Sequence, residues 1–224
     1  MKLIKPSTEI LTIINSGEIF KTLEQVARTC YKSEDRITED GESAKKILNI
    51  LLTRNHEAML EFFDITVKFI VDRGVSHEIV RHRIGSYAQE STRYVNYATE
   101  GKIGHCTFII PPWCNISESE WTHEQAIQST DMNGDINALL WLQHMSWTEK
   151  VYNKLIKEGW KAEEARSVLP NSTKTEINVK FNLREWRHFF KLRTAAAAHP
   201  QMREVTIPLL KEFQEKIPII FDNI

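Results

Sequence analysis

The chain has 224 residues, of which 42% are hydrophobic and 26% are charged, with 29 lysines and arginines against 30 aspartates and glutamates. This length suits one large domain or two small ones, and the ordinary apolar content excludes a disordered chain. No run approaches the roughly 18 apolar residues of a membrane span, and residues 1–10 lack the apolar stretch of a signal peptide. We therefore expect a cytoplasmic protein that has no membrane partner.

Its three cysteines, Cys30, Cys106 and Cys114, form no CxxC pair and leave an odd number. This usage argues against a disulfide framework and suits a reducing cytosol. We interpret each cysteine as a small buried hydrophobic residue rather than as a nucleophile.

The formal net charge of −1 excludes a nucleic-acid binder that works by bulk positive charge. The total hides a segregation, because residues 114–165 contain nine acids and four bases, a balance of −5. Residues 166–203 contain eight bases and two acids, a balance of +6, together with His188 and His199. The basic segment predicts an anionic ligand.

Two amphipathic helices are expected first, at residues 18–30 and 42–53, because apolar residues recur there at three- and four-residue spacing. Ser16 is the candidate N-cap of the first helix. The residues expected to be buried are Ile19, Leu23, Val26 and Cys30 in the first helix, and Ala44, Ile47, Leu48, Leu51 and Leu52 in the second.

Strict alternation of apolar and polar residues predicts half-buried strands at 62–72 and 175–183. Such strands are typical of an antiparallel sheet with one solvated face. On the second strand, Asn182 and Arg184 are assigned to the polar face. A short strand at 107–112 ends in two prolines.

The remaining helices are expected at 75–84, 136–158, 162–168, 185–193 and 203–216, the last bent at Pro208. The apolar stripe expected along the longest helix consists of Ile136, Leu140, Trp147, Val151 and Leu155. There are no evident internal repeats and no linker between two cores. We predict an α+β fold, in which a single domain over residues 1–224 holds an antiparallel or mixed sheet flanked by helices.

The common nucleotide and hydrolase signatures are absent, since the sequence contains no GxGxxG, no Walker A motif and no GxSxG. His77-Glu78 resembles the start of a zincin motif, but the next histidine, His82, follows after five residues instead of four. Five residues rotate a second ligand off the helix face that holds the first. We therefore predict no metal.

The segment 81–94 is more informative. Arg83 and Arg93 bracket hydroxyl, amide and carboxylate side chains. Basic residues at a helix end complement the helix dipole, which accounts for Arg81 to Arg83 but leaves the following polar run unexplained. Arginines supply rigid forks for phosphate, while hydroxyl and amide groups can recognise a base or a ribose.

Arg81-His82-Arg83, followed after seven residues by Ser91-x-Arg93, resembles the signature of flavin-dependent thymidylate synthases at every fixed position. Residues 164–170 resemble that family's second motif. The likeness extends to Asn182-Leu183-Arg184, His188, Leu192-Arg193 and, near the first strand, His56, so it covers about residues 50 to 205.

This resemblance implies the family's α+β fold and the conversion of dUMP to dTMP, with FAD as cofactor. It also implies NADPH as reductant, methylenetetrahydrofolate as carbon donor and no cysteine nucleophile. The expected assembly is a homotetramer whose active sites are shared between protomers. No nucleic-acid partner is implied.

The resemblance also assigns site residues, with Arg193 as the catalytic residue and Ser91 orienting dUMP rather than attacking it. The expected FAD-binding residues are His56, Arg81, His82, Arg83, Gln89, Asn182, Arg184 and His188. The expected dUMP-binding residues are Glu78, Arg81, Gln89, Glu90, Ser91, Thr92, Arg93, Arg166 and Arg193. The sequence departs from the family at Gln89, commonly glutamate, and at Ala58, commonly a small hydroxyl residue. The roles of His199 and Gln201 stay open.

Two alternatives are kept. One is a phosphate- or RNA-binding module that uses the basic segment with Trp186 and Phe189, and it requires these aromatic side chains to be exposed. Their helical spacing, shared with Phe190, favours a core instead. The other is a flavoenzyme that binds a different pyrimidine in the same site.

Overall fold

The computed structural model describes residues 1–99 and 103–224. The chain divides into two compact units. Unit 1 comprises Met1–Ser7, Phe69–Arg81 and Ala88–Ile177, and unit 2 comprises Thr8–Lys68, His82–Tyr87 and Asn178–Ile224. A single domain over the whole chain stays a prediction.

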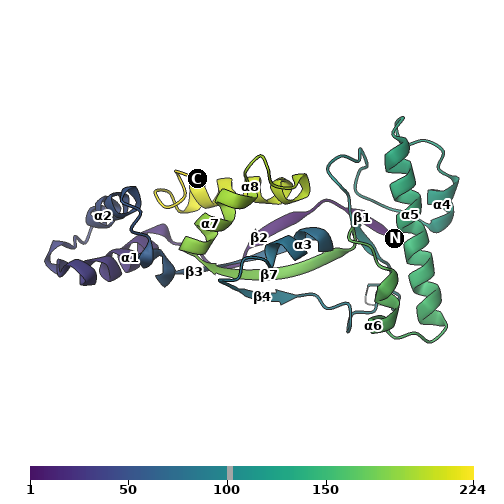
Figure 1. The fold of residues 1–224 in the computed structure, drawn as a ribbon, viewed down its shortest axis with the longest axis horizontal. Coiled ribbons are helices and arrows are strands. Elements are labelled where there is room, and N and C mark those ends of the chain that lie inside the picture. The colour runs from purple at the N-terminus through teal and green to yellow at the C-terminus, as the bar shows by residue number, and fades with distance from the viewer. Residues whose placement is uncertain (100–102) are drawn as a thin grey trace. The chain divides into compact units, whose positions relative to one another are not determined.

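Eight α-helices and seven strands lie in the described residues (Figure 1). The helices are α1 (Ser16–Tyr31), α2 (Glu42–Thr53), α3 (Arg73–Ile79), α4 (His123–Gln128), α5 (Ile136–Lys157), α6 (Ala162–Ala165), α7 (Leu183–Arg193) and α8 (Pro200–Lys216). The strands are β1 (Lys2–Ile4), β2 (Ser7–Ile10), β3 (Asp64–Asp72), β4 (Ser86–Gln89), β5 (Thr107–Ile109), β6 (Ser119–Glu120) and β7 (Lys174–Asn182). Short 3₁₀ turns are η1 (Glu34–Arg36), η2 (Ala58–Phe62) and η3 (Arg166–Val168).

The strands form two sheets, ordered β2-β3-β7-β4 and β5-β1-β6. In the smaller sheet, β1 pairs parallel with β5 and antiparallel with β6. Hydrogen bonds at the two ends of β3 and β7 indicate an antiparallel pair, because Leu183 N donates to Phe63 O and Arg73 N donates to Thr173 O. The predicted α+β fold with antiparallel and mixed sheets is confirmed.

Both nine-residue strands run directly into a helix. At the end of β3, the Asp72 carboxylate caps α3 by accepting from Val75 N at 2.6 Å. At the end of β7, Asn182 Oδ1 caps α7 by accepting from Glu185 N at 2.8 Å. These caps start each helix at once, because a polar side chain satisfies a backbone N–H of the first turn.

The predicted boundaries at these junctions are therefore wrong. Helix α3 begins at Arg73 and ends at Ile79, so Arg81 and His82 lie in the loop that follows it. Arg184 lies in the first turn of α7 and not on the polar face of β7. Alternation of apolar residues alone does not reveal where an Asp or Asn cap converts strand into helix.

The core of unit 2 contains an aromatic cluster formed by α7 and α8. Trp186, Phe189, Phe190 and Phe213 are completely buried, and the Trp186 ring stacks on Phe190 with centroids 5.6 Å apart. Burial of each such side chain contributes about 1.5–3 kcal/mol. The RNA-binding alternative requires exposed aromatic side chains at 186 and 189, so this burial contradicts it.

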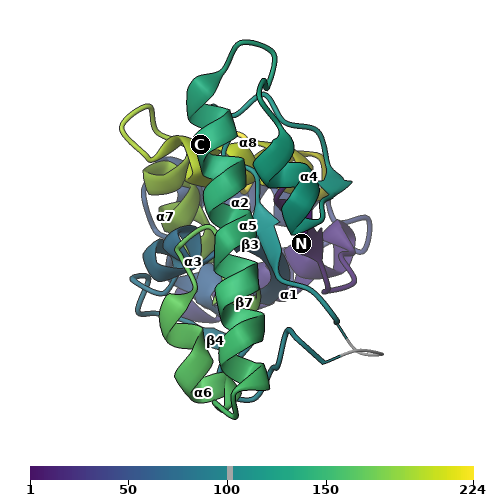
Figure 2. The ribbon, with the colours of Figure 1, turned by 90° about the vertical axis from the view of Figure 1, so that its right-hand side faces the viewer.

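In unit 1, helix α5 lies beside α4 (Figure 2). The buried face of α5 includes Leu139, Leu142, Met145 and Tyr152. The stripe predicted for this helix is wrong, since its members are largely exposed: Ile136 60%, Leu140 58%, Trp147 48% and Val151 40%, with Leu155 half-buried. Apolar residues occur on two faces of α5, and periodicity does not identify which face the core covers.

Further boundaries differ in detail. In unit 2, α1 packs against α2 (Figure 1). The buried face predicted for α2 is confirmed. Cys30, however, is exposed at the end of α1, whereas Cys106 and Cys114 are buried as predicted. Helix α8 begins at Pro200, three residues before the predicted start, and continues through Pro208. No helix among the described residues is long and apolar enough to cross a membrane.

The N-cap of α1 is Asn15, and not Ser16 as the sequence predicts. Asn15 Oδ1 accepts from Gly17 N at 3.1 Å and from Glu18 N at 3.3 Å. We predict that Asn15→Ala lowers the free energy of unfolding by about 1 kcal/mol. Ser16→Ala, the matched control, changes it much less. Urea unfolding at one protein concentration measures both, and equal losses would contradict the assignment.

Candidate active site

The segment His82–Tyr87, a loop that runs into the start of β4, passes tightly against strand β7 in unit 2. A Cβ atom added at Gly85 would overlap the Phe181 ring and lie 3.0 Å from Lys180 O. The Tyr87 hydroxyl donates to His82 O, and burial raises the pKa of Tyr87 to about 12. The loop is thus held close to the sheet, and its first residue, His82, is 5% exposed.

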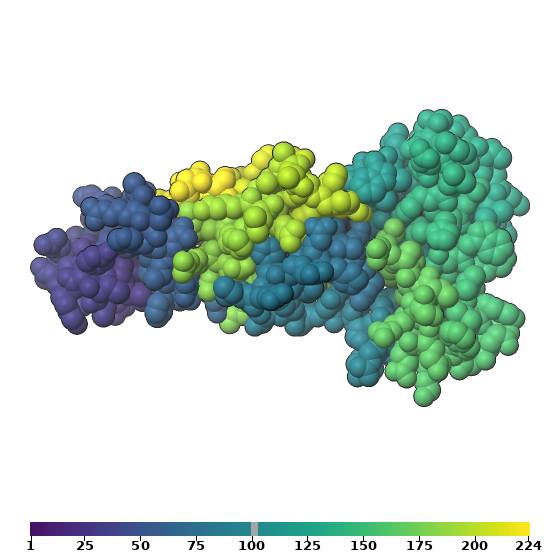
Figure 3. Space-filling view, viewed as in Figure 1, coloured from purple at the N-terminus to yellow at the C-terminus, as the bar shows by residue number. Residues whose placement is uncertain are grey.

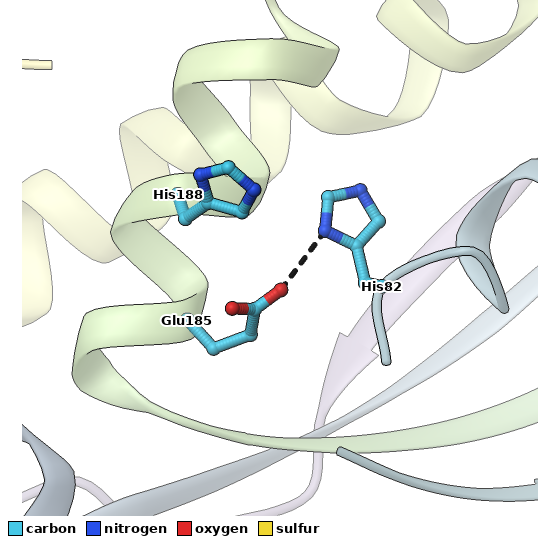
Figure 4. A group of neighbouring side chains, drawn as sticks. All are labelled: His82, Glu185 and His188. Atoms are coloured by element: carbon cyan, nitrogen blue, oxygen red, sulfur yellow. Dashed lines mark hydrogen bonds and ion pairs between the residues drawn. The ribbon is translucent and has the colours of Figure 1, made fainter. Parts of the chain in front are cut away.

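His82 bridges two side chains of α7. Its Nδ1 lies 3.0 Å from Glu185 Oε1, and its Nε2 accepts a hydrogen bond from Arg193 Nε at 3.0 Å. Figure 4 shows Glu185 and His188 projecting from α7 toward His82. The ring also packs edge-on against Phe189, with centroids 4.9 Å apart.

These contacts indicate the protonation state of His82. Burial lowers the pKa of His82, the charges of Arg193 and His188 lower it further, and Glu185 opposes them. The neutral ring carries one proton, and Nε2 must be the unprotonated nitrogen because it accepts the hydrogen bond from Arg193 Nε–H. Nδ1 therefore carries the ring proton and donates it to the Glu185 carboxylate.

His82, Glu185 and His188 also offer a possible metal-ligand set, with one ligand atom from each lying within 4.8 Å of the others. Both nitrogens of His82 already take part in hydrogen bonds. Metal ligation through either nitrogen would break one of these bonds. We therefore assign the cluster to hydrogen bonding, and the absence of a metal stays a prediction.

A pocket of about 500 Å³ opens beside this cluster in unit 2, within the size range of small-molecule sites. Three of its lining residues, Asn182, Arg184 and His188, are among the expected FAD-binding residues. The full lining is Glu57, Glu61, Ile84, Asn182, Arg184, Glu185, Arg187, His188 and Lys191. In the space-filling view, the yellow-green surface of α7 borders the blue surface around η2 (Figure 3).

Most of the charges around this pocket are paired. Arg184 Nη1 lies 2.6 Å from Glu61 Oε1, and both side chains are about half exposed. Arg187 is buried and donates to Glu57 Oε1 at 3.1 Å, to Ile220 O and to Asn223 Oδ1. Arg187 thus links α7 to the C-terminal residues. We assign it a structural role, because its guanidinium is already hydrogen-bonded within the protein.

The basic segment 166–203 is correspondingly less positive in space than in sequence. In unit 2, Lys180 pairs with Asp64 at 2.8 Å. In unit 1, Lys174 pairs with Glu90 at 2.9 Å and with Glu176 at 2.6 Å. Together with Arg184 and Arg187, at least four of its eight bases have acidic partners.

The expected dUMP-binding residues lie mainly in unit 1, where several are held by their neighbours. Gln89 Nε2 donates to Ser76 Oγ at 3.0 Å and to Thr175 Oγ1 at 3.1 Å. Glu90 accepts from the Tyr97 hydroxyl at 2.7 Å in addition to its pair with Lys174. Burial and the charge of Glu90 raise the pKa of Tyr97, so this hydroxyl remains a donor.

Two arginines near Ser91 and Thr92, Arg93 and Arg166, are exposed on the surface of unit 1. Ser91 Oγ accepts from Arg93 N at 3.3 Å, and the Arg93 guanidinium lies over the Tyr94 ring, 5.2 Å from its centroid. Thr92 is buried, and its hydroxyl lies 3.5 Å from Arg166 Nη1. The structure therefore brings Arg166 of η3 beside the signature segment, 74 residues earlier.

The other assigned residues lie as follows. Glu78 of α3 is half-buried, and Arg81 is exposed in unit 1. Arg83 is exposed in unit 2. His56 is exposed, with Nδ1 3.2 Å from the Tyr31 hydroxyl, and it does not line the pocket described above.

Glu185, which is buried and hydrogen-bonded to His82, is not among the site residues predicted from the sequence. A partial signal was available, because Glu185 and His188, three residues apart, lie on one face of α7. Their common partner, however, lies 103 residues before Glu185 in the chain, and helical spacing carries no information about that contact.

Comparison with known proteins decides the family. The family described as thymidylate synthase complementing protein matches residues 12–219. The chain belongs to this family. It is 32% identical over 202 residues to a flavin-dependent thymidylate synthase of Corynebacterium aurimucosum, covering 90% of this chain and 78% of that one. It is 34% identical over 193 residues to the enzyme of the same name from Pyrococcus abyssi, covering 84% and 70%.

Proposed function

We propose that this chain is a flavin-dependent thymidylate synthase, which methylates dUMP to dTMP with methylenetetrahydrofolate as carbon donor and NADPH as reductant. One observation of the geometry carries the proposal. His82 of the family signature and Arg193, 111 residues apart, are hydrogen-bonded to each other. Glu185, the other partner of His82, lines a pocket together with three of the expected FAD-binding residues.

The residues around this pocket fit FAD. Arg184 supplies a half-exposed guanidinium for a phosphate, and Asn182 and His188 supply polar edges beside the exposed apolar side chain of Ile84. Exchanging Glu61 for a phosphate partner costs little, because exposed ion pairs contribute about 0–1 kcal/mol. When bound, FAD would accept a hydride from NADPH and supply the two electrons that convert the transferred one-carbon unit into the methyl group of dTMP. His56, Arg81, His82, Arg83 and Gln89 complete the proposed FAD-binding set.

For dUMP we propose the unit 1 cluster. The exposed guanidinium groups of Arg166 and Arg93 suit the phosphate, since planar forks bind phosphate oxygens in pairs. Ser91, held at the turn before Arg93, orients the nucleotide. Glu78, Arg81, Gln89, Glu90 and Thr92 complete this proposed set.

Arg193 is the proposed catalytic residue. A guanidinium at the uracil edge stabilises negative charge that develops at N3 and O4, which makes C5 more nucleophilic. No cysteine is assigned to the chemistry. Cys106 and Cys114 are buried, and burial raises the pKa of both thiols, which disfavours a thiolate nucleophile. These buried free thiols also suit the cytoplasm that we propose as the location.

The proposed activity is tested with the purified protein. We predict a yellow protein whose flavin absorbance is bleached by NADPH, and which releases tritium from C5-labelled dUMP only when methylenetetrahydrofolate and NADPH are present. A protein unable to bind FAD would refute the proposal. A yellow protein that NADPH bleaches, but that releases no tritium from dUMP, would favour a flavoenzyme acting on another pyrimidine.

For Arg193 we predict that Arg193→Ala lowers the rate of dTMP formation by about 10²- to 10³-fold, the cost of removing one group that stabilises transition-state charge. Flavin content and bleaching by NADPH should change little, because the guanidinium acts on uracil. Rapid-quench measurement of dTMP gives the rate. An unchanged rate would exclude Arg193 as the catalytic residue.

We also propose that the chain assembles as a homotetramer whose active sites are shared between protomers. The exposed stripe of α5, formed by Ile136, Leu140, Trp147 and Val151, supports self-association. Its members repeat on one face of a long helix, and contiguous exposed apolar patches of this kind mark protein contacts. We assign this face to a second copy of the chain.

The assembly prediction uses a substitution that leaves the core intact. Leu140 is 58% exposed, so Leu140→Glu should fold normally and yet place a charge in the α5 contact. We predict a smaller species by light scattering after size exclusion. Asn137→Glu, one turn away and also exposed, is the matched control and should keep the wild-type mass. A tetramer that survives Leu140→Glu would exclude this face as the contact.

A further inference from the structure

We propose that His82 is a positioning residue: held by Glu185 as the neutral Nδ1–H form, it accepts the Nε–H of Arg193 and fixes the plane of that guanidinium. The proposal rests on the catalytic role proposed for Arg193. It adds Glu185, which neither the family signature nor the helical spacing assigned to the site.

The guanidinium of Arg193 has a fixed, planar shape. Nε, Cζ and both Nη atoms of arginine are coplanar and rigid. A single hydrogen bond at Nε, here 3.0 Å to His82 Nε2, therefore sets the direction of the Nη groups as well. A guanidinium that must meet N3 and O4 of a uracil requires such a fixed plane.

The imidazole ring is the connecting element between two residues of α7. Glu185 lies in the first turn and Arg193 is the last residue, so their backbones are separated by about 12 Å along the helix axis. The His82 ring links the two side chains across this distance, with a hydrogen bond to Glu185 at one nitrogen and to Arg193 at the other. Both partners come from one rigid helix, so their relative position is constant.

The surroundings keep the ring in one orientation. Phe181 and Phe189 pack on it with centroids 6.0 Å and 4.9 Å away, and His82 is almost fully buried. A ring flip would place carbon atoms where the nitrogens now bond, leaving the buried Glu185 carboxylate without its partner. An unpaired buried carboxylate of this kind is strongly unfavourable, which disfavours the flipped ring.

The bridge requires a neutral ring. A protonated His82 would present Nε2–H toward the Nε–H of Arg193, and this contact would become repulsive. The titratable or charged groups that face the ring or its backbone are Glu185, His188 and Arg193 of α7, together with Tyr87. Since burial lowers the pKa of His82, the bridge forms at neutral pH and is lost as pH falls below the usual histidine range.

The first test replaces Glu185 by glutamine, which keeps the shape and removes the charge. A carboxamide donates to Nδ1 as readily as it accepts, so the tautomer of His82 is no longer fixed. We predict that Glu185→Gln lowers kcat for dTMP formation roughly 10- to 100-fold. KM for dUMP, FAD content and flavin bleaching by NADPH should stay near wild type. His123→Gln, which removes a half-buried histidine bonded to Ser146, is the matched control and should keep full activity.

A second variant guards against a purely structural explanation. His82→Ala leaves a ring-sized space, so added imidazole should restore part of the lost activity. In the holoenzyme, nitrogen NMR of labelled histidine should report the Nδ1–H tautomer for His82 in the wild type and a mixture in Glu185→Gln. In addition, the acidic limb of the kcat profile should move to lower pH in Glu185→Gln, because Glu185 raises the pKa of His82.

The outcomes separate the two proposals. If Arg193→Ala abolishes dTMP formation while Glu185→Gln and His82→Ala remain at the wild-type rate, the positioning role is wrong and the catalytic role stands. If Arg193→Ala is fully active, the catalytic role itself fails. An Nε2–H tautomer in the wild type, or stoichiometric zinc at His82 that chelators remove with loss of activity, would overturn the bridge.

Discussion

The hydrogen bond from Glu185 N to Asn182 Oδ1 is the constraint on which the unit 2 site depends. It starts α7 immediately after β7, with no loop between them. The register of the strand thereby fixes the rotation of the helix, and Glu185, His188 and Arg193 all face the loop that begins at His82. A longer connection would leave that rotation free, and the bridge through His82 would lose its geometry.

The same junction occurs at β3 and α3, where Asp72 takes the place of Asn182. The two junctions lie 110 residues apart, and each follows a nine-residue strand. This similarity is invisible as a sequence repeat, because only the alternation and the capping residue are shared. Local physics therefore produces two equivalent strand-to-helix turns, one before the family signature and one before Arg193.

How much of this could be predicted varies with the distance over which each contact acts. The strands 64–72 and 174–182 and the helix 42–53 follow from periodicity, since their buried faces are local properties. The site residues come from a motif, which names side chains without placing them. Glu185 was not predicted as a site residue, because its partner is 103 residues away. The stripe predicted for α5 was wrong, because the core covers a second apolar face of that helix.

Charge pairing gives the near-neutral composition a physical meaning. The basic segment is less positive in space than its sequence suggests, because Glu57, Glu61, Asp64 and Glu90 pair with four of its eight bases. An anionic ligand that binds Arg184 would therefore displace the carboxylate of Glu61, because this arginine is already paired. Such an exchange favours ligands whose phosphate and ring bind together, since the phosphate alone gains little over a carboxylate. Selectivity then arises from the combined shape of the pocket and the fixed donors around it, and net charge contributes little.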